Sequence, residues 1–461
     1  MAIAFAILSG LLLWSGFPPF DLVIGPFIGA AILFRLLSRY ELRRRWALSC
    51  IAGFSFFAPL LHWSGSYVGW LPWVLLALLQ TGMFTLISVP RFERTVRGSL
   101  LFASAFTVIE LLRMKFPFGG FGWGRVGHTQ VDLFSSVYPL VGVAGITFLV
   151  SSLSALVILA SRQILVVIFI LPIALLMPKF SATGNLSVTA IQGGVDKLGF
   201  DYNERALGVL NRHVDRTLSS SSRPELFIWP ENASDIDPIV DTRAKARISE
   251  VLETKKIPLL VGAVLRGVEG PKNVSILYQP SGEIASMYIK QDLAPFGEYM
   301  PLRTLAERIA PEAKRVRDFQ PGSTWTTHEV AGYKFISLIC FEVLDDDFIR
   351  NGAKDAAFLV AQTNNATFGK SAQAAQQLQI IRARAAELRR DIAVVSTTGF
   401  SAHIDSSGSI EKELVQFQPG ELNMEISTYE SRTVASRLGS WFWLGLFGLV
   451  LITSRRSVFS R

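Results

Sequence analysis

The chain has 461 residues, half of them hydrophobic, and its mean hydropathy is +0.37. This length allows two domains, and this hydropathy is typical of a membrane protein rather than of a soluble one. The formal net charge of +8 could suggest a nucleic-acid partner, but most basic clusters lie beside apolar runs, so we predict none. With only two cysteines, Cys50 and Cys340, a disulfide framework and a multi-cysteine metal site are excluded.

Eight long apolar runs predict transmembrane helices, and several approach the roughly 20 residues that a bilayer requires. The first run lacks the basic segment and the cleavage site of a signal peptide, so we expect it to be retained as a helix. The second and seventh are short and could instead be tilted, kinked or re-entrant, and Pro172 lies inside the seventh. The runs cover about residues 2–16, 22–37, 46–63, 69–89, 99–114, 137–160, 163–178 and 439–454.

The basic residues of the short loops predict the orientation of these helices, because arginine and lysine accumulate on the cytoplasmic side. Basic residues follow the second, fourth, sixth and eighth runs, whereas the opposite loops contain only Arg113, Lys115 and Arg125. Both termini are therefore expected in the cytoplasm. The predicted parts are transmembrane helices one to seven in 1–179, an extracytoplasmic domain in 180–436, and a final transmembrane helix with a cytoplasmic tail in 437–461.

The segment 180–436 differs from the rest because strand-like runs alternate with polar, helix-forming ones. The strand-like runs are short, rich in β-branched and aromatic residues, and bounded by Gly, Pro, Asn or Asp, so they predict an α/β layered domain. The predicted strands are 186–192, 225–230, 257–264, 273–280, 284–290, 334–342, 356–363, 391–398 and 401–405. The predicted helices are 201–218, 241–256 and 371–390.

Three reactive side chains end predicted strands of this domain: Glu231, Lys290 and Cys340. Ligands of open α/β sheets bind beyond the carboxyl ends of strands, so these groups could converge. Together they suit acyl transfer, because a thiolate is a nucleophile, a carboxylate can take its proton, and an ammonium can stabilise an oxyanion. Taken singly, each also has a structural explanation: an inert core cysteine, a helix-capping glutamate and a solvated lysine.

The local sequences resemble the nitrilase superfamily and, in particular, its membrane branch, the apolipoprotein N-acyltransferases. WPE at 229–231 is similar to the catalytic-glutamate motif of that family, KQDLAPFGEYMPLR at 290–303 to its lysine motif, and ICFE at 339–342 to its nucleophile motif. Further similar segments extend the resemblance over nearly the whole chain, most closely to actinobacterial members. These segments are 17–22, 116–130 and 363–408, and the segment 193–214 is most similar to actinobacterial members.

The resemblance implies a fold and a set of roles. The fold is a multi-pass α-helical membrane bundle of about eight transmembrane helices plus an extracytoplasmic α/β nitrilase-like αββα sandwich domain. Cys340 is then the nucleophile and Glu231 its general base, while Lys290 stabilises the oxyanion together with a backbone N–H near Phe341.

Two further acids, Glu298 and Glu342, match acidic positions that the family also needs around the site. Glu298 lies eight residues past Lys290 and could orient its ammonium group. Because strand side chains alternate, we expect Glu342 on the same strand face as Cys340, although a helix-capping or salt-bridging acid is the alternative.

The chain departs from the family pattern at several positions. Phe341 stands where the nucleophile motif usually has Tyr, and Gln377 stands where a His often follows Gln376, so that His cannot be catalytic here. Gly122 replaces a usual Pro before Trp123, and Phe200 stands near the place where other branches have a Trp. Trp123 and Phe341 are the predicted lipid-binding residues, and the apolar loops 117–123 and 291–300 the candidate lipid entrance and lid.

The implied reaction moves a fatty acyl chain from a glycerophospholipid, through a thioester on Cys340, to the α-amine of a diacylated lipoprotein in the bacterial plasma membrane. No cofactor is expected, and the five histidines form no short metal-ligand pattern, so no metal is expected either. Two alternatives stay open. One is a membrane-tethered amidase of the nitrilase type, and the other is a non-enzymatic partner of a polyprenol-phosphate mannose synthase.

Overall fold

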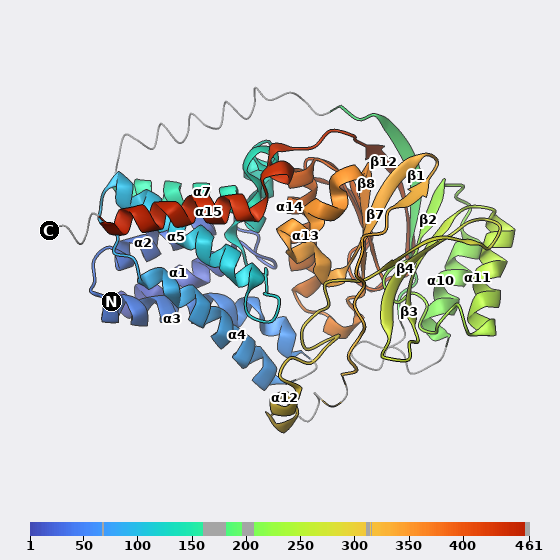
Figure 1. Cartoon of the computed structure of the whole chain (residues 1–461), viewed down its shortest axis with the longest axis horizontal. Helices are drawn as coiled ribbons and strands as arrows, with labels where there is room; N and C mark the ends of the chain where they lie inside the picture. Colours follow the sequence, from blue (N-terminus) through green and yellow to red (C-terminus); the bar gives the residue numbers. More distant parts are fainter. Residues whose placement is uncertain (67–68, 160–180, 196–206, 310–313, 315, 457–461) are drawn as a thin grey trace. The chain divides into compact units, whose positions relative to one another are not determined.

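The computed structural model describes residues 1–66, 69–159, 181–195, 207–309, 314 and 316–456. The chain forms two compact units (Figure 1). The first, here the membrane unit, comprises residues 1–179, 386–388 and 433–461, and the second, the sheet unit, comprises 180–385 and 389–432. The seventh predicted span, at 163–178, lies outside the described residues, as does Phe200.

Apolar helices make up most of the described part of the membrane unit. Three are long and apolar enough to cross a bilayer, within Trp70–Ser88, Tyr138–Ile158 and Val434–Thr453, and two further apolar helices are shorter. The eight-span bundle therefore remains a prediction. The longer helices are α1 (Ala2–Ser15), α2 (Gly25–Leu37), α3 (Leu42–Leu60), α4 (Trp70–Thr85), α5 (Val96–Lys115), α7 (Tyr138–Ile158) and α15 (Val434–Arg456).

Small residues let the first helices approach closely. A side chain at Gly10 of α1 would meet the backbone carbonyl of Ala52 in α3 at 2.2 Å, so only glycine fits there. Ser9 of α1 donates a hydrogen bond to the carbonyl of Gly29 in α2 at 2.7 Å. Close backbone approach and interhelical hydrogen bonds are typical of helix packing in lipid, where no hydrophobic effect drives association.

The sheet unit contains two six-stranded sheets. The strand order is β12-β1-β2-β3-β4-β5 in the first and β11-β10-β9-β8-β7-β6 in the second. Strands β1 to β3 run parallel, as do β7 to β9, and the outer neighbours are antiparallel. The first sheet comprises β1 (Gly184–Gln192), β2 (Leu226–Ile228), β3 (Leu259–Leu265), β4 (Lys272–Tyr278), β5 (Ile284–Ile289) and β12 (Gly420–Thr428). The second comprises β6 (His328–Val330), β7 (Tyr333–Ile339), β8 (Phe358–Thr363), β9 (Ile392–Ser396), β10 (Ala402–Ile404) and β11 (Ile410–Glu413).

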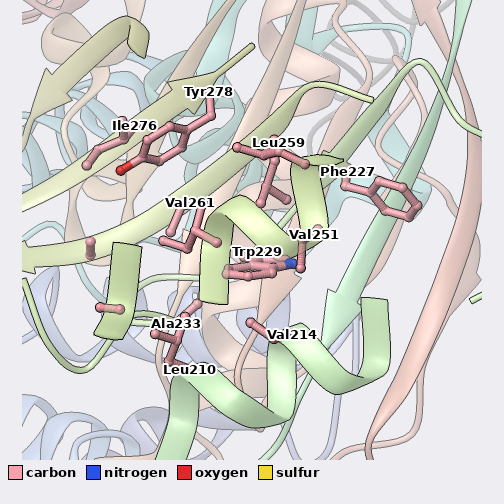
Figure 2. Packing of buried hydrophobic residues seen from close by; sticks show 14 of the residues in the cluster. Leu210, Val214, Phe227, Trp229, Ala233, Val251, Leu259, Val261, Ile276 and Tyr278 are labelled. Carbon is pink, nitrogen blue, oxygen red and sulfur yellow. The ribbon is translucent and has the colours of Figure 1, made fainter. Parts of the chain in front are cut away.

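Helices and sheets of this unit form four layers, αββα. The inner faces of the sheets share a core that includes Ile228, Phe335 and Val360. The outer face of the first sheet packs through Trp229 against α10 (Gly208–Ser219) and α11 (Thr242–Lys255) (Figure 2). On the other side lie α13 (Asp346–Gly352) and α14 (Gln373–Leu388) (Figure 1), and α12 (Arg303–Ile309) lies between β5 and β6 in sequence.

Each of the nine predicted strands overlaps a strand of the structure, and the early end of one of them changes the site. The run 334–342 leaves the sheet after Ile339, because Cys340 adopts a left-handed backbone with φ of 54°. Residues Cys340–Leu344 then form a 3₁₀ helix. The expectation that Glu342 shares a strand face with Cys340 was therefore wrong, because strand alternation does not continue through a left-handed residue and a 3₁₀ turn.

Candidate active site

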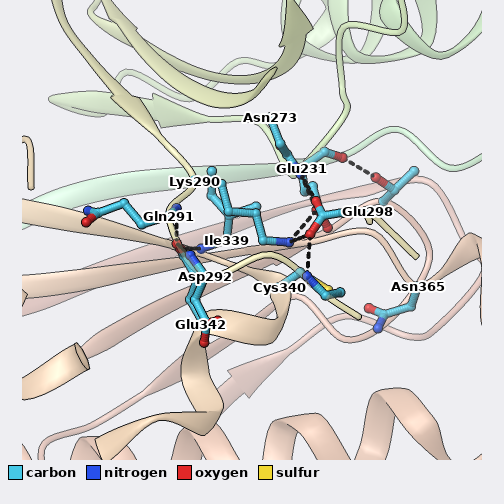
Figure 3. Close-up of polar contacts among 12 residues, drawn as sticks. Glu231, Asn273, Lys290, Gln291, Asp292, Glu298, Ile339, Cys340, Glu342 and Asn365 are labelled. Atoms are coloured by element: carbon cyan, nitrogen blue, oxygen red, sulfur yellow. Dashed lines mark hydrogen bonds and ion pairs between the residues drawn. The ribbon is translucent and has the colours of Figure 1, made fainter. Parts of the chain in front are cut away.

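The three reactive side chains predicted from strand ends lie in one buried cluster (Figure 3). Glu231 follows β2 and Lys290 follows β5, both in the first sheet, while Cys340 follows β7 in the second. The exposed fractions are 5% for Glu231, 1% for Lys290 and 8% for Cys340. The site is therefore assembled between the ends of the two sheets, and each sheet supplies part of it.

The Lys290 ammonium group lies between two carboxylates. Its Nζ is 2.7 Å from Oε2 of Glu298 and 3.8 Å from Oε1 of Glu231. Asn273, at the start of β4, donates from Nδ2 to Oε1 of Glu231 at 2.8 Å and to Oε1 of Glu298 at 2.9 Å. One amide thus fixes both carboxylates that face the lysine. Asn273 was not identified as a site residue from the sequence. The one feature that could have indicated it is its place as a polar residue at the start of a predicted strand.

The backbone around Glu231 is held from the second sheet. Gln362 of β8 donates from Nε2 to the carbonyl of Trp229 at 2.7 Å. Thr397, just after β9, donates from its hydroxyl to the carbonyl of Glu231 at 3.2 Å. Both bonds are buried, so the acid-bearing loop is held by two separate strands and is pre-organised rather than free to move.

Burial and mutual charge set the protonation states of the cluster. Burial raises the pKa of Glu231, although the nearby Lys290 ammonium opposes the rise. Burial alone would lower the pKa of Lys290, but the carboxylates of Glu298 and Glu231 outweigh it and the pKa rises. Burial also raises the pKa of the Cys340 thiol, and the charge of Glu231 adds to this effect. The resting thiol therefore keeps its proton until a base removes it.

Glu342 connects the nucleophile turn to the lysine strand. Its Oε2 accepts a hydrogen bond from the N–H of Ile339 at 2.8 Å. Its Oε1 accepts from the hydroxyl of Tyr288 at 2.6 Å and from the N–H of Gln291 at 2.9 Å. Burial raises the pKa of Glu342 to about 7. The carboxylate therefore joins the residue before Cys340 to the residue after Lys290.

This arrangement can perform nucleophilic acyl transfer. A thiol, a carboxylate and an ammonium share a water-poor site, where electrostatic stabilisation of developing charge is stronger than in water. Among the described residues, no group of three or more His, Cys, Asp or Glu side chains could hold a metal ion.

Comparison with known proteins gives the family. The profile described as apolipoprotein N-acyltransferase N-terminal domain matches residues 9–156, and that described as carbon-nitrogen hydrolase matches residues 222–433. An apolipoprotein N-acyltransferase of Mycolicibacterium smegmatis is 32% identical over 94% of this chain and 81% of its own. The chain belongs to the apolipoprotein N-acyltransferase family.

Other members of this family are similar over nearly the full length. The apolipoprotein N-acyltransferase of Geobacter metallireducens is 26% identical over 97% of this chain and 94% of its own. Among solved structures, a CN-hydrolase superfamily protein from Xanthomonas campestris is 19% identical and has a TM-score of 0.41, covering 53% of this chain and 91% of that protein.

The two residues predicted to contact lipid lie in different units. Phe341 is half-buried directly after the nucleophile position. Trp123 is fully buried inside the membrane unit, with its ring centroid 4.9 Å from that of Trp63. Its backbone carbonyl accepts a hydrogen bond from Arg113 at 2.6 Å. This contact holds Trp123 within the helices, so any effect on lipid would pass through neighbouring side chains.

Proposed function

We propose that this chain is a membrane acyltransferase that moves a fatty acyl chain from a glycerophospholipid to the α-amine of the N-terminal diacylglyceryl-cysteine of lipoproteins. The reaction would pass through a thioester on Cys340. The observation that carries this proposal is the buried contact of Lys290 with Glu298 and Glu231 in the cluster that contains Cys340. Membership of the apolipoprotein N-acyltransferase family supports the same substrates.

In the first half-reaction the thiol is acylated. The Glu231 carboxylate takes the thiol proton as Sγ of Cys340 attacks the carbonyl carbon of the phospholipid ester. The Lys290 ammonium and a backbone N–H near Phe341 stabilise the oxyanion of the tetrahedral intermediate. The C–O bond of the ester then breaks, the proton passes from Glu231 to the departing oxygen, and lysophospholipid leaves.

In the second half-reaction the acyl group moves to nitrogen. The α-amine of the lipoprotein attacks the thioester carbonyl, and Glu231 accepts the proton that the amine loses. The C–S bond breaks, the thiolate leaves and is reprotonated by Glu231, and the amide is the product. Donor and acceptor use the same thiol in turn, so ping-pong kinetics are expected.

The membrane unit would bring the thiol to its substrates. Moving an acyl chain into water costs about 0.8 kcal/mol per methylene, so a site beside the bilayer avoids a large penalty. We propose the predicted eight-span topology, with both termini cytoplasmic and the sheet unit facing the outer leaflet. Loop 291–300 is proposed as the lid, because Phe296 at its centre is exposed and Glu298 connects the loop to the lysine.

Mass spectrometry of the purified protein after incubation with phospholipid tests this function. The wild type should gain the mass of one fatty acyl group, and the Cys340→Ser protein should not. Cys50→Ser is the matched control and should keep the adduct, because Cys50 lies in helix α3 of the membrane unit. A wild-type protein that releases free fatty acid and never retains an adduct would instead behave as a hydrolase.

The partnership with a polyprenol-phosphate mannose synthase stays a prediction. It rests on the resemblance of segment 193–214 to actinobacterial members. Co-purification of the two proteins, compared between wild type and Cys340→Ala, would test it. Binding that survives the loss of the thiol would indicate a second role that does not need the chemistry.

A further inference from the structure

Gln377 of helix α14 contacts the nucleophile position directly. Its Nε2 donates a hydrogen bond to the backbone carbonyl of Cys340 at 3.0 Å and lies 3.8 Å from Sγ of the same residue. The side chain is 2% exposed. A polar side chain this deeply buried is normally fixed by its hydrogen bonds, so its partners indicate its role.

The orientation of the Gln377 amide follows from its partners. The carbonyl of Cys340 can only accept a hydrogen bond, so the nitrogen of the Gln377 amide must face it. The oxygen then faces Asn365, which donates from Nδ2 to Oε1 of Gln377 at 2.9 Å and to Oε1 of Gln373 at 2.7 Å. Oδ1 of Asn365 in turn accepts from the hydroxyl of Ser396 at 2.8 Å. The donor that faces Cys340 is therefore held from the end of β9.

Cys340 needs such a support for two reasons. The left-handed backbone of Cys340 is unfavourable for a residue other than glycine, so neighbouring contacts must hold it. The sulfur must also carry negative charge during attack. The carboxylates of Glu231 and Glu298 disfavour that charge, and the Lys290 ammonium group favours it. An amide N–H beside Sγ adds a donor to the thiolate without adding a titrating charge.

We propose that Gln377 is a positioning residue that holds Cys340 in its left-handed attack conformation and donates a hydrogen bond to its thiolate. The inference rests on the proposed function, in which Cys340 is the acylated thiol. The amide of Gln377 is a donor that does not titrate near neutral pH, unlike a histidine ring.

The test is the pH dependence of iodoacetamide alkylation of Cys340 in the purified full-length protein, in a Cys50→Ser background so that one thiol reacts. Gln377→Leu removes the donor, and Gln377→Glu keeps the shape but replaces the donor by a carboxylate oxygen. For both we expect the midpoint of the alkylation profile to rise by about one pH unit. We also expect thioester formation from phospholipid to slow about tenfold at unchanged KM.

Two further variants complete the design. Gln377→His restores a ring N–H donor and should recover most of the rate. Gln379→Leu, at another buried glutamine of α14, is the matched control and should leave the alkylation profile as in the wild type. Wild-type profiles and rates in both Gln377→Leu and Gln377→Glu would overturn the inference. A wild type without an acyl adduct would overturn the proposed function instead, and the alkylation profiles would still decide the role of Gln377.

Discussion

Each unit of the molecule buries a cluster of charged side chains, and the two clusters differ in what they surround. In the membrane unit Glu110 accepts hydrogen bonds from the N–H of Val126 at 2.7 Å and from the hydroxyl of Thr147 at 2.6 Å. Arg113 donates to Gln80 at 2.7 Å and to the carbonyl of Trp123. These contacts connect α5 to α4, to α7 and to the segment that follows α5, so they explain how this part of the membrane unit is held together.

In the sheet unit the charges surround a thiol. Lys290 and its two carboxylates act electrostatically on Cys340, and Glu342 fixes the residue before it. Ionisable residues within membrane helices are treated as functional by default. Both units bury charge, and in the part of the chain that the structure describes the sheet unit alone combines that charge with a cysteine on a left-handed backbone. Buried charge therefore marks a fixed structure, and a reactive group beside it is needed to indicate a site.

The largest difference between the two clusters should appear when the general base Glu231 is removed. Glu231→Gln keeps the shape of the side chain but cannot take the thiol proton, so thioester formation should fall about a thousandfold. Rapid-quench mass spectrometry of the acyl adduct measures this rate. A loss of less than tenfold in a folded protein would mean that another group accepts the proton.

The second largest effect is expected when the ammonium group of Lys290 is removed. Lys290→Met removes the oxyanion stabiliser and leaves Glu298 and Glu231 without their cation, so thioester formation should fall about a hundredfold. Lys255→Met is the matched control, because Lys255 is also buried in the sheet unit but donates to the carbonyls of Leu218 and Ser220. The control should lose stability and keep its rate per folded molecule. Equal rate losses in both variants would argue against a specific role for Lys290.

Glu342 should show a smaller rate effect and a distinct pH effect. Its pKa is about 7 in the folded protein against an ordinary value of 4.5, so the folded state holds the proton more tightly. Stability from this group is full below pH 4.5 and is lost as the pH rises through 7. Glu342→Gln should flatten that decline, measured as Tm in detergent from pH 4.5 to 7, and should slow thioester formation about tenfold. If the Tm of the Glu342→Gln protein declined with pH as the wild type does, the Glu342 carboxyl group would not be the source of that decline.

Much of the sheet unit could be predicted from the sequence, because nine of its strands lie in short apolar runs, three of which end in reactive residues. The residues missed are those whose roles depend on distant partners. Strands β6, β11 and β12 were not predicted. GELNMEIST of β12 alternates polar and apolar residues as a half-buried strand does, but it lacks the apolar run by which the other strands were recognised, and it pairs with β1 more than 200 residues away. Long-range pairing of this kind leaves little local signal.

The same limit applies inside the site. Glu231, Lys290 and Cys340 could be predicted because each ends a strand within a recognisable motif. The contacts of Asn273 and Gln377 could not be predicted, because their side-chain amides form hydrogen bonds to residues 42 and 37 positions away in the sequence. The turn at Cys340 could not be predicted either, since a left-handed cysteine goes against local preference and exists only where the surroundings hold it.

The smallest expected effect on chemistry comes from the membrane cluster. Arg113→Met removes the donors to Gln80 and Trp123 and leaves Glu110 buried with less compensation, which should cost about 3 kcal/mol of stability and lower the Tm. Arg97→Met, on the exposed side of the same helix, is the control and should leave the Tm nearly unchanged. Because Arg113 contacts Gln80, Trp123 and Phe57 of the membrane unit, the alkylation profile of Cys340 should not move. A shifted profile in folded Arg113→Met protein would show that the two clusters are coupled, and the distinction between structural and reactive buried charge would fail.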